Sequence, residues 1–167
     1  DTPLYYDIVF DADTGQEAGF LESVMRAYAA GKKSETWRVL EPACGSGRLA
    51  AELARRGHEV CGFDLNENML GYARERLARC GLDGLLWRDR MEDFKVPSRR
   101  KFDLAHCLVS TFKYVLDGPG AVSHLRRVAA SLRVGGLYVL GLHLTDYKSR
   151  SAEHERWIAA RDGIRVA

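Results

Sequence analysis

The chain lacks an apolar run long enough to cross a membrane, and no charged-then-apolar leader precedes its first expected strand. Its cysteines are few and form neither a C-x-x-C pair nor a zinc-like spacing with histidine; they are Cys44, Cys61, Cys80 and Cys107. The first absence argues against a membrane-spanning protein, and the second argues against a zinc site. We therefore expect a cytoplasmic protein with reduced, mostly buried thiols, no metal site and no membrane partner.

An excess of charge of one sign is also missing. The 25 Lys and Arg residues are balanced by 23 Asp and Glu residues, which gives a net charge of +2. Three short basic clusters at 55–56, 99–101 and 126–127 are separated, and solvated helix faces and loop edges explain them better than contacts with nucleic acid. With 167 residues, 46% of them apolar, and no internal repeat, the chain has the size and composition of one globular domain.

Apolar strands alternate with amphipathic helices along most of the chain. We expect strands at 37–41, 59–64, 84–88, 102–109 and 137–143, and helices at 48–56, 67–79 and 120–133. Strands joined by crossover helices form a parallel sheet, and right-handed crossovers with a change of direction after the third strand give the order 3-2-1-4-5. The predicted fold class is α/β, a Rossmann-like doubly wound parallel sheet. An aromatic start and an amphipathic stretch over 17–30 predict an N-terminal helical segment outside this sheet.

The first strand runs into a glycine turn that opens a helix, and the second strand ends on a carboxylate. Gly45, Gly47 and Ala50 fit the G-x-G-x-x-G/A fingerprint of dinucleotide sites, and Asp64 lies where such a site has its ribose-binding acid. Glu41, at the end of the first strand, separates the candidate cofactors. Its negative charge repels a pyrophosphate at the helix N-terminus and attracts a cationic ligand. S-adenosylmethionine has an ammonium, a sulfonium and no phosphate, so it fits this charge better than NAD.

The sequence Glu-x-Ala-Cys-Gly-x-Gly at 41–47 resembles motif I of the class I S-adenosylmethionine-dependent methyltransferases. It departs from the usual motif at Ala43, where the family most often has its first glycine. Three later segments resemble further family motifs: 88–93 the acidic adenine motif, 102–114 the motif IV strand and loop, and 125–136 the helix and Gly-Gly turn before the fifth strand. The resemblance covers about residues 36–144. It implies S-adenosylmethionine as the methyl donor and S-adenosylhomocysteine as its product.

The resemblance also implies which residues bind the cofactor. Asp64 is expected to accept hydrogen bonds from both ribose hydroxyls. A carboxylate of the 88–93 segment is expected to accept a hydrogen bond from the adenine amino group, and Met91 is expected to cover a face of the adenine ring. The remaining positions are Tyr6, Glu41, Ala43, Cys44, Gly45, Gly47, Arg48, Leu65, Met69, Asp89, Arg90, Leu108 and Thr111. A helix cap or turn is an alternative role for Asp64, because Asn66 and Glu67 also suit a helix start.

The segment after the fourth strand bears on the acceptor. It reads Leu-Val-Ser-Thr-Phe at 108–112, where DNA adenine methyltransferases have Asn-Pro-Pro-Tyr or a close variant to hold a flipped base. There is no Pro-Cys nucleophile for cytosine, and a short-chain dehydrogenase is excluded because the only Tyr-x-x-x-Lys pair, Tyr28 with Lys32, precedes the glycine loop. We therefore expect a small-molecule acceptor. Methylation of a DNA or RNA base and a non-catalytic cofactor-binding module are the alternatives, and the sequence predicts no oligomeric state.

The sequence assigns no catalytic residue. Methyl transfer is an in-line displacement at an already activated carbon, so the protein mainly supplies the geometry of approach and, where the acceptor is protonated, a base. The candidates near the strand ends are Tyr114, Lys113, His143, Asp146 and Tyr147. His106 lies within the fourth strand and is expected to be structural.

We divide the chain into an N-terminal lid or cap at 1–33, a cofactor-binding core at 34–150 and the start of a C-terminal extension at 151–167. The aromatic residues Tyr5, Tyr6 and Phe10 fit a lid over the cofactor, whereas the periodic apolar residues that follow fit a helix packed permanently on the sheet; both interpretations stay open. The family's closing hairpin after the fifth strand has no expected counterpart within these residues. We therefore expect a longer natural chain that completes the sheet and the acceptor pocket.

Overall fold

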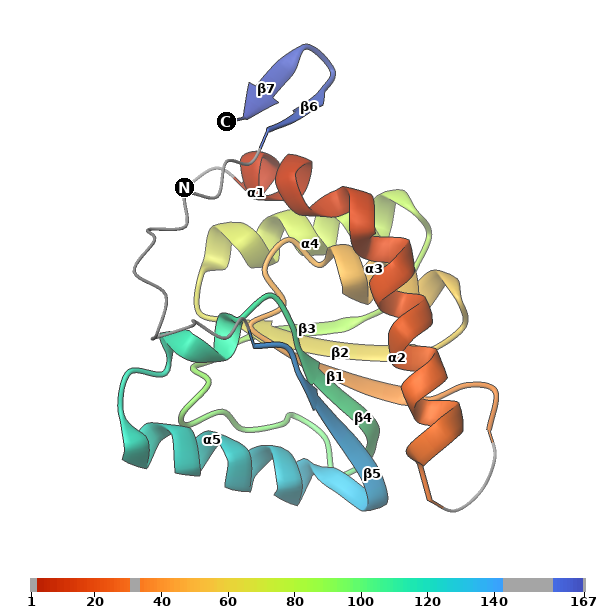
Figure 1. The fold of residues 1–167 in the computed structure, drawn as a ribbon, viewed down its shortest axis with the longest axis vertical. Helices are drawn as coiled ribbons and strands as arrows, with labels where there is room; N and C mark the ends of the chain where they lie inside the picture. Colours follow the sequence, from red (N-terminus) through yellow and green to blue (C-terminus); the bar gives the residue numbers. More distant parts are fainter. Residues whose placement is uncertain (1–2, 31–33, 143–157, 167) are drawn as a thin grey trace, which may run out of the picture.

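The structure, a computed structural model, describes residues 3–30, 34–142 and 158–166. Its centre is a parallel sheet of five strands in the order β3-β2-β1-β4-β5 (Figure 1). The strands are β1 (Arg38–Pro42), β2 (Glu59–Asp64), β3 (Leu85–Arg88), β4 (Phe102–Cys107) and β5 (Leu132–Leu140). The predicted strand order and the predicted Rossmann-like doubly wound fold are therefore confirmed.

Helices cover both faces of the sheet, with α2, α3 and α4 on one side and α5 on the other (Figure 1). The helices are α1 (Pro3–Phe10), α2 (Thr14–Tyr28), α3 (Arg48–Arg55), α4 (Glu67–Arg79) and α5 (Gly118–Ser131), with short 3-10 helices η1 (Asp11–Asp13) and η2 (Thr111–Tyr114). The predicted N-terminal helical segment outside the sheet is confirmed. None of the helices in the described ranges is long and apolar enough to cross a membrane.

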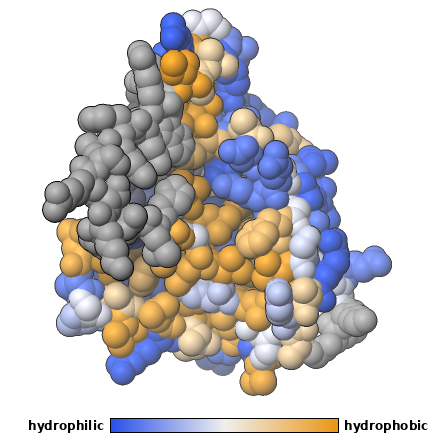
Figure 2. Space-filling model, viewed as in Figure 1, coloured by the Kyte–Doolittle hydropathy of each residue, from blue (hydrophilic) through white to orange (hydrophobic). Residues whose placement is uncertain are grey.

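Alternate residues of the central strand supply the two halves of the core, because successive side chains of a strand point to opposite faces. Val39 packs with Leu21 of α2 and Leu53 of α3, and all three are buried. The next residue, Leu40, packs in the second cluster with Val128 of α5. On the face shown in Figure 2, apolar residues form a broad area in the part of the view where Figure 1 shows β4, β5 and η2.

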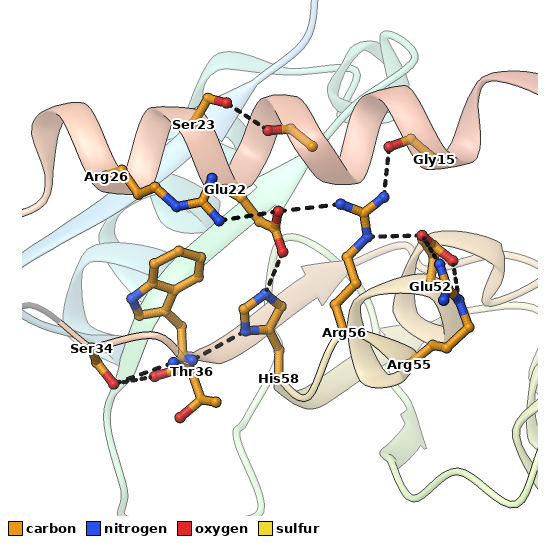
Figure 3. Close-up of polar contacts among 12 residues, drawn as sticks. Gly15, Glu22, Ser23, Arg26, Ser34, Thr36, Glu52, Arg55, Arg56 and His58 are labelled. Carbon is orange, nitrogen blue, oxygen red and sulfur yellow. Dashed lines mark hydrogen bonds and ion pairs between the residues drawn. The ribbon is translucent and has the colours of Figure 1, made fainter.

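Polar contacts fix α2 to the sheet as well (Figure 3). Glu22 of α2 lies 3.2 Å from His58 Nε2 and forms an ion pair with Arg56 at 3.2 Å. His58 Nδ1 accepts a hydrogen bond from the backbone N–H of Trp37 (3.3 Å), and the imidazole stacks on the Trp37 ring with centroids 4.8 Å apart. A backbone N–H can only donate, so the proton of the neutral imidazole is on Nε2 and is donated to Glu22. These contacts favour permanent packing for α2, which leaves α1 as the candidate lid.

The start of β5 differs from the prediction. The strand begins at Leu132 instead of 137, and its pairing with β4 shifts register between Phe102↔Leu132 and Leu104↔Leu137. Gly135 lies in this irregular part with a φ of 76°, and a Cβ there would lie 2.9 Å from the Cβ of Ala30. The extra residues of β5 are accommodated by a bulge at which glycine allows both the backbone angle and the close approach. The prediction was wrong because helix periodicity alone carried the preceding helix past Ser131.

The end of β4 also differs from the prediction. The strand ends at Cys107 instead of 109, because Val109 and Ser110 have φ values of 55° and 57° in the left-handed region. A β-branched residue adopts such an angle at a cost, and it places a sharp bend directly after the strand. The chain therefore turns into η2 at the carboxyl edge of the sheet.

Residues near the end of the chain form a separate two-stranded antiparallel sheet. Its strands are β6 (Ala159–Arg161) and β7 (Ile164–Val166), joined by a turn at Asp162 and Gly163 that has φ values of 51° and 79°. This hairpin lies in the segment that was predicted as the start of a C-terminal extension, residues 151–167. Among the described residues no strand joins the five-stranded sheet beyond β5.

Candidate functional site

The turn between β1 and α3 has an unusual backbone. Ala43, Gly45 and Gly47 have φ values of 54°, 52° and 66°, all in the left-handed region. Ala43 adopts this angle although its Cβ makes the angle unfavourable. This explains physically why the motif that this segment resembles most often has a glycine at the position. Gly47 also permits close packing, because a Cβ at this position would lie 2.6 Å from the Cβ of Ala73 on α4. The turn is therefore tight and presents its backbone at the carboxyl edge of the sheet.

Asp64, the last residue of β2, is tied to this turn. One carboxylate oxygen accepts the backbone N–H of Gly45 (2.9 Å), and the other accepts the backbone N–H of Asn66 (2.8 Å). Asn66 is the N-cap of α4, since its side chain accepts hydrogen bonds from the backbone N–H groups of Asn68 and Met69. Asp64 therefore has the turn role that was considered for it, whereas Asn66 forms the N-cap of α4. A carboxylate has further lone pairs, so these two contacts leave acceptor capacity for a ligand.

A cleft of about 550 Å³ opens beside Asp64 at the carboxyl edge of the sheet. Its walls come from α1, the glycine turn, the ends of β2 and β3, and η2. The lining residues are Tyr6, Ala43, Gly45, Phe63, Asp64, Leu65, Asn66, Met69, Asp89, Arg90, Met91, Glu92, Thr111 and Tyr114. Its position is the one at which open parallel sheets bind nucleotide ligands.

A second cavity of about 20 Å³ shares part of this wall and has roughly the volume of one water-sized group. Its lining residues are Tyr6, Glu41, Pro42, Ala43, Cys44, Arg48, Leu49, Cys107, Leu108, Val109 and Thr111. Every residue predicted to bind the cofactor lines one of the two cavities, except Gly47, which packs against Ala73. Sequence reasoning missed three residues of the larger cleft. They are Phe63, Asn66 and Glu92; of these, Glu92 lies in the acidic 88–93 segment from which a carboxylate was expected to contact the adenine.

Glu41 is the most unusual group in the smaller cavity. The residue is only half-buried, but its Oε2 is shielded from solvent and no described residue forms a hydrogen bond with it. Burial raises the pKa of this carboxyl to about 8; Arg48 lowers it, and Glu17 and Asp64 raise it. A buried carboxylate oxygen with no partner is costly, and a cationic ligand would remove that cost.

Arg48, the first residue of α3, is a cation near Glu41 that already has its own carboxylate. Its Nη1 lies 2.5 Å from Glu17 Oε2 and donates a hydrogen bond to the Thr14 hydroxyl (2.8 Å), both on α2. Glu17 therefore offsets the charge of Arg48, and Glu41 Oε2 has no hydrogen-bond partner among the described residues. Sequence reasoning missed Glu17 and Thr14, because only the packing of α2 brings them to the glycine turn.

One buried carboxylate joins α1 to the glycine turn. Asp7 accepts hydrogen bonds from the Ser46 hydroxyl (3.1 Å), from Arg161 of β6 (2.9 Å) and from Arg76 of α4. Burial raises the pKa of Asp7, but the hydrogen bonds from Arg161 and Arg76 outweigh this effect and the pKa is lowered overall. An ionised Asp7 thus holds the neighbouring Tyr6 at the cleft, and burial raises the pKa of that tyrosine.

The loop after β3 forms the wall opposite α1. Asp89 accepts hydrogen bonds from the backbone N–H groups of Arg90 (2.9 Å) and Lys95 (2.8 Å), which closes the loop on itself. The Asp89 N–H bonds to the carbonyl of Asp64 (3.1 Å), so the loop and the end of β2 are held together. Met91 lies in the same wall of the cleft.

The catalytic candidates are placed unevenly. Tyr114 lines the cleft and is 76% exposed, whereas Lys113 is exposed and does not line it. His143, Asp146 and Tyr147 lie outside the described residues. His106 is buried in β4, and burial lowers its pKa to about 3, so it is neutral. Neither cavity wall includes His106, which agrees with the structural role expected for it.

The cysteines are free thiols, buried at Cys44, Cys61 and Cys107 and exposed at Cys80. Burial raises the pKa of Cys107 to about 12, which keeps this thiol protonated. Within the described ranges no group of three or more His, Cys, Asp or Glu residues is arranged to hold a metal ion.

Comparisons with known proteins assign this chain to one class. A family model described as a methyltransferase domain matches residues 39–136, so the chain belongs to this family, the class I S-adenosylmethionine-dependent methyltransferases. The chain is 29% identical over 108 residues to a putative methyltransferase of Geobacillus sp. (strain WCH70), covering 65% of this chain and 43% of the relative. It is 31% identical over 116 residues to glycine N-methyltransferase of Oryctolagus cuniculus, covering 62% and 39%. The chain thus spans less than half the length of these relatives.

The solved structures agree on the fold. The amino pentose methyltransferase CalS10 of Micromonospora echinaspora, solved with bound S-adenosylmethionine, superposes with a TM-score of 0.72 at 23% identity, covering 90% of this chain and 59% of that one. At this identity the likeness concerns the fold, and it supports the strand order derived above. The cofactor of the family is S-adenosylmethionine.

Proposed function

We propose that this chain binds S-adenosylmethionine in the cleft at the carboxyl edge of the sheet and takes part in methyl transfer to a small-molecule acceptor, with S-adenosylhomocysteine as product. The observation that carries the proposal is Glu41. Glu41 lines a cavity of water-sized volume beside the glycine turn, and its shielded Oε2 has no hydrogen-bond partner among the described residues. An ammonium group suits this volume and charge, whereas the pyrophosphate of NAD would meet a carboxylate. The residues therefore fit the cofactor of the family.

The other contacts follow from the walls of the cleft. Asp64 is proposed to hold the ribose, and the loop of Asp89, Arg90 and Met91 to hold the adenine. Bound S-adenosylmethionine supplies a methyl group activated by its sulfonium. The protein's own part is to orient the cofactor and the acceptor and to exclude water from between them. Tyr114 is the candidate from η2 that reaches the cleft and could accept or relay a proton.

The names of the relatives support a small acceptor, since they describe methylation of glycine and of an amino pentose. We also place the protein in the cytoplasm, a proposal supported by its four free thiols.

Calorimetry tests the cofactor directly. S-adenosylhomocysteine is expected to bind to the chain with one site, and NAD is expected to bind at least tenfold more weakly. S-adenosylhomocysteine offers an ammonium to Glu41 and has no phosphate, whereas NAD has a pyrophosphate and no ammonium. Tighter binding of NAD would overturn the proposal. Methyl transfer from labelled S-adenosylmethionine across a panel of small molecules and DNA then identifies the acceptor class. Transfer to DNA alone, or to no acceptor by the full-length protein, would favour the base methyltransferase or the non-catalytic module.

Hydrogen exchange tests α1 as a lid. The amides of residues 5–10 are expected to exchange faster without ligand than with S-adenosylhomocysteine, because a filled cleft adds contacts at Tyr6 to the hydrogen bonds that Asp7 already makes. The amides of α2 serve as the internal control, since Glu22, Arg56 and His58 fix this helix in both states. Equal protection of residues 5–10 in both states would rule out the lid.

A further inference from the structure

One face of α5 grips the loop after β3. Three side chains at helical spacing donate hydrogen bonds to three backbone carbonyls within four residues of this loop. The pairs are Ser123 Oγ to Glu92 (2.6 Å), His124 Nδ1 to Met91 (2.9 Å) and Arg127 Nη1 to Phe94 (3.0 Å). Met91 and Glu92 line the cleft, whereas no residue of α5 does. The helix therefore reaches the site through this loop.

His124 is the buried member of this set, and its protonation is defined by its neighbours. The side chain is fully buried, and its ring packs beside Phe112 and Tyr138 with centroids 5.3 Å and 5.7 Å away. The Met91 carbonyl can only accept, so Nδ1 carries the proton of the neutral imidazole. Nε2, 2.6 Å from the Tyr138 hydroxyl, must then accept the hydroxyl proton. Burial lowers the pKa of His124 and raises the pKa of Tyr138, which keeps both groups neutral.

Cys107 of β4 lies beside this hydrogen-bonded pair. Burial raises the pKa of Tyr138, and the neighbouring Cys107 thiol raises it further. Cys107 lines the smaller cavity and Met91 lines the larger one. A chain of neutral groups thus runs behind the site from the end of β4 through β5 and α5 to the loop after β3.

We propose that His124 is a positioning residue that sets the Met91 carbonyl, and with it the loop proposed to hold the adenine, and so determines the affinity and base preference of the cofactor site. The inference rests on the proposed function for its ligand. Its mechanism is physical: a buried carbonyl without a donor is costly, so loss of the imidazole N–H frees the loop to seek solvent. Ser123 and Arg127 are more accessible than His124, and they hold the neighbouring carbonyls of Glu92 and Phe94.

Three variants separate positioning from general stability. His124→Phe keeps a ring but removes the donor to Met91 and the acceptor for Tyr138. His124→Asn keeps a donor at the position of Nδ1, because both nitrogens are bonded to Cγ. Val128→Ala is the matched control, since Val128 is fully buried on the same helix and has an apolar side chain with no hydrogen bond to give the loop.

The readout is binding of S-adenosylhomocysteine and of S-inosylhomocysteine, which lacks the adenine amino group, at a temperature where every variant is folded. His124→Phe is expected to weaken binding of S-adenosylhomocysteine about tenfold and to reduce its preference over the inosine analogue. His124→Asn is expected to keep most of the affinity for S-adenosylhomocysteine and most of the preference over the inosine analogue. Val128→Ala is expected to retain the full affinity and the full preference. Equal affinities and preferences for His124→Phe and Val128→Ala would overturn the inference.

Hydrogen exchange of residues 89–95 without ligand provides a second measurement. His124→Phe is expected to accelerate exchange in this loop beyond any acceleration caused by Val128→Ala. If the wild-type chain failed to bind S-adenosylhomocysteine, the proposed function would be wrong, whereas the exchange rates would still decide the positioning role. Unchanged loop exchange in His124→Phe would reject that role.

Discussion

Glu41→Gln is expected to weaken binding of S-adenosylhomocysteine about thirtyfold at pH 8. The glutamine has nearly the same size but no charge, so it removes a charge-assisted contact with the ligand ammonium, worth roughly 1.5 to 3 kcal/mol, and leaves the cavity in place. Calorimetry at low and moderate salt measures the effect. The salt dependence should be small, because the carboxylate oxygen is shielded from solvent.

The same contact makes binding depend on pH. The pKa of Glu41 is about 8, raised by burial and by Glu17 and Asp64 and lowered by Arg48. Below that pH the carboxyl is largely protonated, and a cationic ligand must displace the proton in order to pair with it. The affinity of the wild-type chain is expected to rise up to tenfold per unit from pH 6 to pH 8, with proton release. Glu41→Gln should show neither the rise nor the release.

The unliganded chain should show the opposite trend in stability. The pKa of Glu41 is raised from its usual 4.5 to about 8, so between these values the folded state keeps a proton that the unfolded state has lost. The free energy of unfolding therefore falls as the pH rises through this window, and Glu41→Gln reduces that fall. Urea unfolding at pH 5 and pH 8 measures the difference.

Glu59→Gln is the matched control for both experiments. Glu59 begins β2 at the opposite edge of the sheet, where it pairs with Arg38 and Arg100 at 2.8 Å. Its replacement should leave the affinity for S-adenosylhomocysteine and its pH dependence unchanged. A thirtyfold loss in Glu59→Gln, or full affinity in Glu41→Gln, would contradict the role assigned to Glu41.

Much of the site could be predicted because parallel strands bring their carboxyl ends to one edge. Once Glu41 and Asp64 were assigned to strand ends, the topology alone placed both carboxylates beside the glycine turn. Gly47 was predicted as a ligand contact from its motif, and the structure adds a second constraint that no local pattern encodes: a Cβ at this position would lie 2.6 Å from the Cβ of Ala73. The left-handed angle of Ala43 was likewise visible only as a departure from a motif.

The residues that support the site could not be predicted, because their contacts join distant parts of the chain. Asp7 reaches Arg161 across 154 residues, and His124 reaches Met91 across 33 residues. No spacing or charge pattern in the sequence distinguishes Asp7 or His124 from an ordinary helix residue. The register shift of β5 had no signal beyond Gly135, because a bulge depends on the fit between two strands.

Asp64→Ala is expected to weaken binding of S-adenosylhomocysteine at least tenfold. Two hydrogen bonds from ribose hydroxyls to a carboxylate are worth roughly 1.5 to 3 kcal/mol each at most, and both are lost with the side chain. The substitution also leaves the backbone N–H groups of Gly45 and Asn66 without their acceptor, so the glycine turn loses order as well. Both effects lower the affinity, and a control has to separate them.

Asp103→Ala supplies this control. Asp103 of β4 likewise accepts a backbone N–H, that of Arg38 (2.8 Å), and bonds to Arg133, but it lies at the opposite edge of the sheet from the cleft. Its loss should lower the stability of the fold without changing the affinity for S-adenosylhomocysteine. The ribose contribution is isolated by comparing S-adenosylhomocysteine with its 2′-deoxy analogue. The wild-type chain should prefer the former, and Asp64→Ala should bind the two alike. A preference that survives in Asp64→Ala, with the fold intact by circular dichroism, would mean that other groups hold the ribose.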